Sequence, residues 1–188
     1  MNRLRFTAIA VLIPLAALLQ ACAEREGADV PEEASRASTV YAVNYPLAYF
    51  AQRIGGDRID VVLPVPAGID PAEWQPDAEQ VLAFQDADII LLNGAGYARW
   101  IERAVLPGSK LVDSSAGFAD RLIVEQNEMR HKHGPGGAHD HGRLAATTWL
   151  DPQLAALQAQ AVCDALTARW PQFADEFAER NRALVEEL

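Results

Sequence analysis

The stretch Asp88-Ile-Ile-Leu-Leu92 decides the fold class of this chain of 188 residues. It is short and nearly all apolar, so neither side of it is suited to face water. Such a run is typical of a strand that is covered on both faces, as strands of parallel sheets are. The sequence therefore predicts a buried parallel strand over Asp88–Leu92, followed by a turn at Asn93-Gly-Ala-Gly96.

Outward from this run, three further stretches predict strands, and helical patterns lie between them. The predicted strands are Thr39–Asn44, Ile59–Val65 and Lys110–Asp113. The predicted helices begin at Pro46, after the candidate N-cap Asp77, and at Tyr97, and Gly55-Gly56 ends the first of them. Alternating strands and helices predict an α/β fold over residues 39–150, with a four-stranded, mainly parallel sheet and flanking helices.

In open sheets of this kind, ligands bind beyond the carboxyl ends of the strands. We therefore expect the binding side of the molecule to be formed by the loops that follow Asn44, Val65, Leu92 and Asp113.

Residues 151–188 predict a long helical region. Apolar residues recur at helical spacing from Leu154, and Pro171 is suited to restart a helix at its first turn. No Gly, Asn or Pro lies near Leu188, so we expect the chain to be cut within a longer protein. The apolar stripe Phe173, Phe177 and Leu184 is then expected to lack its packing partner and to drive association.

The first 21 residues are interpreted as a lipoprotein signal peptide. Arg3 and Arg5 precede an apolar run over residues 6–19, and Leu19-Gln-Ala-Cys22 provides a cleavage site with Cys22 as the lipid-bearing N-terminus. A buried N-terminal helix is the alternative. Residues 22–38 are mostly polar and acidic and predict a flexible tether, so the protein is expected to be extracytoplasmic and anchored to a membrane.

The charge balance excludes one class of partner. The chain has 16 basic and 26 acidic residues and a net charge of −10. A surface this acidic disfavours nucleic acid and mildly favours cations. If Cys22 carries lipid, Cys163 cannot form an internal disulfide, and we expect it to be a small buried residue on a helix.

All four histidines lie in one segment, His131–Gly142 (HKHGPGGAHDHG). His131, His133, His139 and His141 form two His-x-His pairs joined by a Gly/Pro-rich turn. Neutral imidazole binds Zn²⁺, Cu²⁺ or Ni²⁺, so these four are the candidate metal ligands, with Glu73 as a further candidate. A solvated loop that binds metal only loosely is the alternative.

Other motifs do not indicate catalysis. Asn93–Gly96 lacks the third glycine of a dinucleotide fingerprint, and neither G-x-S-x-G nor H-E-x-x-H occurs. Trp74, Trp100 and Trp149 are expected to pack against other side chains and not to stack on a ligand. The protein is therefore not expected to be an enzyme.

Four segments in order carry a resemblance to a known family. They are Tyr45–Gly56 (YPLAYFAQRIGG), Val65–Pro71 (VPAGIDP), Ala87–Gly96 (ADIILLNGAG) and Trp149–Pro152 (WLDP). From about residue 39 to its end, the chain resembles the zinc/manganese-type solute-binding proteins of bacterial ABC importers, the zinc-uptake or adhesin-lipoprotein group. The resemblance implies two α/β lobes joined by a long helix with the metal between them. Residues 151–188 then resemble the connecting helix, and the second lobe is missing.

The chain departs from the family pattern at the metal site. Ala72 stands where the family has a histidine after Asp-Pro, and Thr147 stands where the family has one two residues before Trp149. Zinc-type members often carry a histidine-rich loop where this chain has one. We therefore expect a metal-binding lipoprotein of an ABC importer, with an ABC permease as partner and zinc as the first choice among divalent transition metals. The alternative is an adhesin-like or metal-buffering lipoprotein that keeps the fold without the interlobe site.

Overall fold

The computed structural model describes residues 38–125 and 143–188. The predicted signal peptide, the tether apart from Ser38, Cys22 and the four histidines lie outside the described residues. None of the helices in the described part of the chain is long and apolar enough to cross a membrane.

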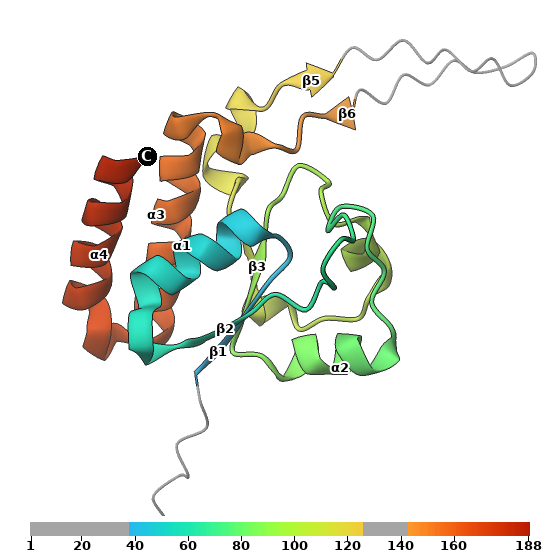
Figure 1. The fold of residues 1–188 in the computed structure, drawn as a ribbon, viewed down its shortest axis with the longest axis horizontal. Coiled ribbons are helices and arrows are strands. Elements are labelled where there is room, and N and C mark those ends of the chain that lie inside the picture. The colour runs from blue at the N-terminus through green and yellow to red at the C-terminus, as the bar shows by residue number, and fades with distance from the viewer. Residues whose placement is uncertain (1–37, 126–142) are drawn as a thin grey trace, which may run out of the picture. The chain divides into compact units, whose positions relative to one another are not determined.

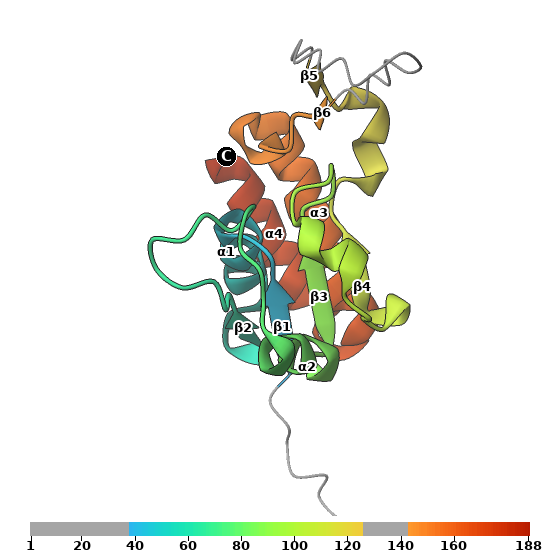
Figure 2. The same cartoon turned by 90° about the vertical axis from the view of Figure 1, so that its right-hand side faces the viewer.

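A four-stranded parallel sheet forms the centre of the described fold (Figures 1 and 2). Its order is β2 (Asp60–Val62), β1 (Thr39–Ala42), β3 (Ile89–Leu92) and β4 (Leu111–Asp113), and every pair is parallel. The four strands agree with the prediction, although each is shorter. Ile89, Ile90 and Leu91 are at most 4% exposed, so the prediction of a strand covered on both faces is confirmed.

Three α-helices lie on one side of the sheet and pack against one another, and a fourth lies on the other side (Figure 1). The first group is α1 (Tyr45–Gly55), α3 (Pro152–Arg169) and α4 (Ala174–Glu187), and the single helix is α2 (Ala78–Asp86). Asn44 caps α1, accepting a hydrogen bond from the Leu47 amide at 3.1 Å, and Gly56 ends it with a φ of 55°. The predicted N-cap Asp77 is confirmed, because it forms a reciprocal capping box with Gln80.

Aromatic side chains fill the space between the sheet and α2. Phe84 of α2 lies with its ring centroid 4.9 Å from that of Trp100 and 4.8 Å from that of Tyr41 on β1, and Trp74 meets Trp100 edge to face at 5.9 Å. Trp74 and Trp100 are buried, as predicted. The helix expected from Tyr97 is a short 3₁₀ helix, Arg99–Arg103, whose buried residue is Trp100.

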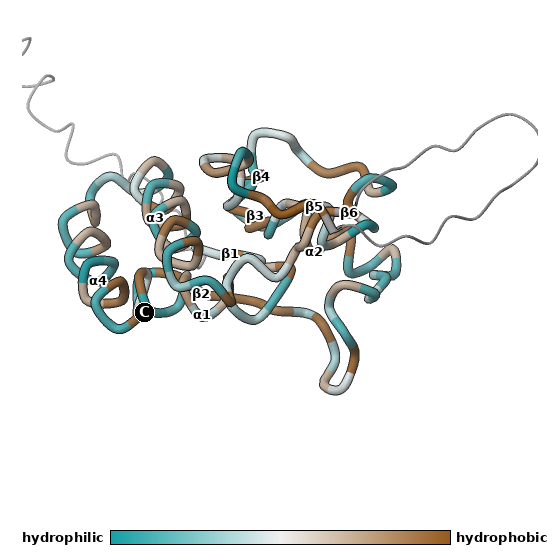
Figure 3. Tube along the Cα trace, turned by 90° about the horizontal axis from the view of Figure 1, so that it is seen from above, coloured by the Kyte–Doolittle hydropathy of each residue, from teal (hydrophilic) through white to brown (hydrophobic). Residues whose placement is uncertain are grey.

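The expected exposure of the last helix is wrong. A 3₁₀ turn at Pro171–Phe173 reverses the chain, and α4 packs against both α1 and α3. Phe177 and Leu184 are fully buried there, and Phe173 is half-buried. The chain itself covers the apolar stripe, and Figure 3 shows hydrophilic residues along much of α4.

Polar contacts reinforce this packing of α4. Arg180 donates to the carbonyl oxygen of Gly55 at 2.9 Å, at the C-terminus of α1 where helical carbonyls lack partners. Arg53 pairs with Glu187 at 2.6 Å and Arg58 with Glu176 at 2.9 Å. On the α3 side, Cys163 is buried, which confirms its predicted role as a small core residue.

Candidate functional site

Buried amides lie where the sheet strands end. We call this region the carboxyl edge; it contains Asn44 after β1, Asn93 after β3 and Ser114 after β4, each 1% exposed. The Asn44 amide donates to Asn93 Oδ1 at 3.0 Å, and Ser114 Oγ lies 3.5 Å from the Asn93 carbonyl oxygen. Because neighbouring parallel strands end together, their terminal polar residues meet, as the predicted binding side requires.

The turn after β3 depends on glycine. Gly94, Ala95 and Gly96 have φ values of 75°, 51° and 69°, three successive residues in the left-handed region. A Cβ on Gly94 would lie 1.9 Å from Ser115 Oγ and 2.2 Å from Asp113 Oδ1. The turn can therefore pass over the end of β4 only with glycine at position 94.

Two other loops meet this turn. The ring of Tyr97, just after the turn, lies edge to face with Trp149 at 5.5 Å. Burial, and secondarily the negative charge of Asp70 in the loop after β2, raise the pKa of the Tyr97 hydroxyl. The turn after β3 therefore packs through Tyr97 against the segment before α3.

These loops contain Glu73, a candidate metal ligand, and the two positions, Ala72 and Thr147, where the family pattern has histidines. Asp70 Oδ1 accepts a hydrogen bond from the Ala72 amide at 2.9 Å, and Glu73 follows with its side chain exposed to solvent. Thr147 is exposed and borders a hollow of about 480 Å³. Thr148, Asp151 and residues 121–123 line the same hollow. Methyl and hydroxyl groups therefore stand where imidazoles are expected from the family.

No metal centre is formed within the described part of the chain. Among residues 38–125 and 143–188, no three His, Cys, Asp or Glu side chains are placed to hold an ion. Glu73 as a ligand stays a prediction, as do His131, His133, His139 and His141, which lie outside the described residues. The strands on either side of the histidine segment are described, however. β5 (Val124–Glu125) and β6 (Arg143–Leu144) pair antiparallel, so its two flanks lie side by side.

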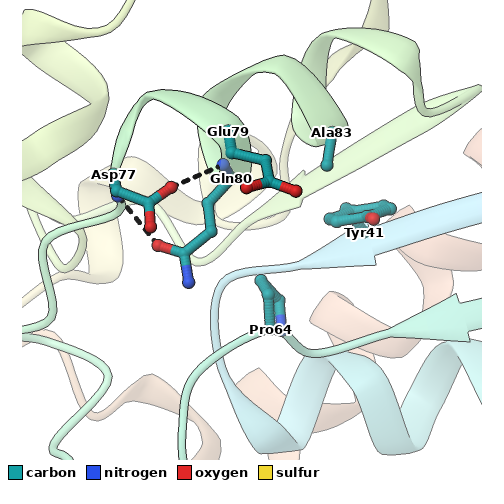
Figure 4. Close-up of a pocket in the computed structure, with 6 residues that line it drawn as sticks. All are labelled: Tyr41, Pro64, Asp77, Glu79, Gln80 and Ala83. Carbon is teal, nitrogen blue, oxygen red and sulfur yellow. Dashed lines mark hydrogen bonds between the residues drawn. The ribbon is translucent and has the colours of Figure 1, made fainter.

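A second hollow of about 370 Å³ lies between β1 and the start of α2 (Figure 4). Asp77 and Gln80 are engaged there in the capping box, with both hydrogen bonds at 2.8 Å. Of its lining residues, Glu79 is the remaining charged one, beside Tyr41 and Pro64. The groups that line this hollow thus mainly stabilise the helix start and provide no set of ligands.

The buried amides are functional candidates that the sequence reasoning missed. A signal for two of them is visible, because Asn44 and Asn93 both end predicted strands at the same edge. Gln158 on α3 is fully buried and replaces an apolar residue on the buried face of that helix, four residues after Leu154. An amide at such a position indicates a buried partner, which here is the carboxyl edge.

Comparison with known proteins gives one family and several relatives. The sequence model of the family described as "Zinc-uptake complex component A periplasmic" matches residues 40–188. The zinc-binding lipoprotein AdcA of Streptococcus pneumoniae is 28% identical over 148 residues, which cover 77% of this chain and 29% of AdcA. The manganese ABC transporter substrate-binding lipoprotein PsaA of Streptococcus mitis is 30% identical over 146 residues, which cover 76% of this chain and 45% of PsaA.

Solved structures show the same fold. The metal-dependent lipoprotein YcdH from Bacillus subtilis superposes with a TM-score of 0.65 at 19% identity, over 80% of this chain and 51% of YcdH. The chain thus spans about a third to a half of the length of these three proteins.

Proposed function

The chain belongs to the family of zinc-uptake complex component A periplasmic proteins, and from this membership we propose that it binds a divalent transition metal, preferably Zn²⁺, as the extracytoplasmic component of an ABC importer. The observation that carries the proposal is the family match over residues 40–188. Relatives named for zinc and for manganese support a metal cargo. The proposed activity is binding and delivery, not catalysis.

The choice of zinc depends on the chain's own residues. Ala72 and Thr147 offer no imidazole, so the proposed ligands are His131, His133, His139 and His141, with Glu73 as a further candidate. Zn²⁺ binds nitrogen ligands at about 2.0–2.1 Å in tetrahedral sites, whereas Mn²⁺ prefers oxygen and lies at the weak end of the divalent series. A donor set made mainly of imidazoles therefore favours Zn²⁺ over Mn²⁺.

The partners follow from the same proposal. We propose that residues 151–188 correspond to the helical region that leads to a second lobe in the family, and that an ABC permease receives the metal. The family match, which includes residues 151–188, supports this correspondence. A lipid on Cys22 would keep the protein beside its permease.

The proposal is tested by calorimetric titration of the purified protein with Zn²⁺, Ni²⁺ and Mn²⁺ at pH 7.5. We expect saturable Zn²⁺ binding, and Mn²⁺ affinity lower by roughly a hundredfold or more, as the order of divalent affinities for nitrogen ligands implies. Mn²⁺ binding as tight as Zn²⁺ binding would reject the zinc assignment, and binding of none of the three metals would reject a metal-binding function for this chain.

Membrane attachment is expected to depend on Cys22. In cells that express the wild-type chain, the protein should sediment with membranes, because a cleaved and acylated Cys22 carries the anchor. Cys22→Ala should leave the protein outside the membrane fraction or uncleaved. Wild-type protein that appears in the soluble fraction together with the variant would contradict the lipoprotein assignment.

A metal-buffering or adhesin-like lipoprotein is the second candidate, and Ala72 and Thr147 are the residues that favour it. The two functions differ in what happens to cellular zinc. An importer component requires that loss of this protein lower zinc accumulation when zinc is scarce. A buffer or adhesin leaves accumulation unchanged in cells that lack it.

A further inference from the structure

α4 has a polar residue in the middle of its buried stripe. Asn181 is 4% exposed and lies between the fully buried Phe177 and Leu184, four residues after the first and three before the second. At this spacing a helix turns one stripe toward its neighbours, which here are α1 and α3. An amide within an otherwise apolar stripe requires a physical explanation, because burying a polar group opposes folding unless the group is hydrogen-bonded.

The Asn181 amide has a partner on α3 for one of its two polar atoms. Asn181 Nδ2 donates to Gln160 Oε1 at 2.8 Å, and Gln160 Nε2 donates to Asp164 Oδ1 at 2.7 Å. Because a carboxylate accepts hydrogen bonds, Asp164 attracts the amide nitrogen of Gln160 and leaves the Gln160 oxygen to face α4. Asn181 Oδ1 is buried and has no hydrogen-bond partner among the described residues. The contact is therefore specific, but it lowers the stability of the fold.

Other registers of α4 would lose this contact. A slip by four residues brings Asn181 to the place of Phe177, and a slip by three brings it to the place of Leu184, and both places are fully buried in the apolar core. There the whole amide would be buried away from Gln160, which opposes folding more than the single unpaired oxygen of the observed register does. A leucine at position 181 would be tolerated in all three places.

We propose that Asn181 fixes the register of α4, because its buried amide is compatible with only one position of this helix on α1 and α3. A single buried asparagine is known to select register in packed helices at the expense of stability. The arginines that contact α4 or extend from it, Arg53, Arg58 and Arg180, select less strictly. Their side chains are between 34% and 44% exposed, and exposed ion pairs of long side chains contribute little and can re-form after a slip.

The register of α4 determines where this helix ends. Figures 1 and 2 show the end of α4 next to the beginning of α3. A slip by one helical turn would move this end by about 5.4 Å relative to the sheet. Asn181 therefore fixes the end of α4 relative to the rest of the fold, and this inference is independent of metal binding.

Two variants remove the register constraint with opposite effects on stability. Asn181→Leu removes the unpaired oxygen and adds apolar surface, so the urea midpoint should rise by about 0.5 M or more. Gln160→Ala leaves the Asn181 amide unpaired in every register, so the midpoint should fall by about 0.5 M or more. Arg182→Leu and Gln153→Ala are the matched controls, because residues 182 and 153 are exposed positions on the same two helices.

Amide NMR spectra of the full chain report the number of positions that α4 occupies. In the wild type and in both controls, each α4 residue should give one signal. In Asn181→Leu and Gln160→Ala, α4 residues such as Ala183 should give additional or exchange-broadened signals, because slipped positions become populated. The same spectral change in two variants with opposite midpoint shifts separates a loss of register from a change of stability.

A single set of α4 signals in either Asn181→Leu or Gln160→Ala would overturn the proposal. A lower urea midpoint for Asn181→Leu would overturn it as well, since the amide would then stabilise the fold. Additional α4 signals in Arg182→Leu or Gln153→Ala would show that any change on these helices disturbs α4, and this result would also reject a specific role of Asn181.

Discussion

Replacing His131, His133, His139 and His141 together with alanine should lower the Zn²⁺ affinity at pH 7.5 by about a hundredfold or more, because the change removes all imidazole ligands of the chain. Calorimetry of the variant and the wild type measures the difference. Lys132→Ala is the matched control, since residue 132 lies between two of the histidines and its ammonium group is not a metal ligand at this pH. Equal affinity of wild type and the fourfold variant would place the site outside the histidine segment.

The Zn²⁺ affinity of the wild type and of the fourfold variant should also differ in its dependence on pH. A free histidine has a pKa near 6.5, and only its neutral form can bind Zn²⁺. Zn²⁺ affinity of the wild type should therefore be full above about pH 7.5 and fall as protons compete on the way to pH 5. The weak binding left in the fourfold variant should change much less over this interval. Wild-type affinity that stays constant would show that carboxylates, and not imidazoles, bind the metal.

Leu184→Ala should lower the free energy of unfolding by about 2–5 kcal/mol, the usual cost of truncating a fully buried leucine. Leu184 is 0% exposed and lies on the face of α4 that packs in the core with Phe177. The substitution removes apolar surface from this contact and leaves a cavity in the space between the helices. Urea unfolding followed by circular dichroism measures the difference between the variant and the wild type.

Val185→Ala is the control for that experiment, because it changes the neighbouring residue of the same helix. Val185 is 39% exposed, so its truncation should cost well under about 1.5 kcal/mol. Comparable losses in the two variants would mean that α4 does not dock in solution as it does in this structure. The stripe Phe173, Phe177 and Leu184 would then be exposed after all.

The fold was predictable where a local sequence pattern indicates a single type of secondary structure. The run over Asp88–Leu92 is nearly all apolar, as is typical of a strand covered on both faces. Asp77 and Gly56 indicate a helix start and a helix end through hydrogen bonding and φ alone. The packing of α4 was not predictable in this way, since the pattern of Phe177 and Leu184 identifies an apolar face without identifying its partner. That partner is formed by α1 and α3, and α1 lies more than a hundred residues earlier in the sequence.

The polar cluster at the carboxyl edge was predictable in its location and less so in its residues. Neighbouring parallel strands end together, and Asn44 and Asn93 meet at that edge. The contribution of Gln158 depends on how α3 lies against the sheet, which no spacing within the helix reveals. Local sequence therefore indicates the candidate metal ligands, whereas the full set of buried amides becomes visible only in three dimensions.

The ladder of β5 and β6 allows the length of the sequence between these two strands to vary during evolution. Because the two strands pair with each other and not with the main sheet, the length of the sequence inserted between them can change without altering the register of β1 to β4. Doubling the length of a flexible loop costs only about 0.6 kcal/mol in closure entropy. The sequence between β5 and β6 can therefore change at almost no cost to the main sheet.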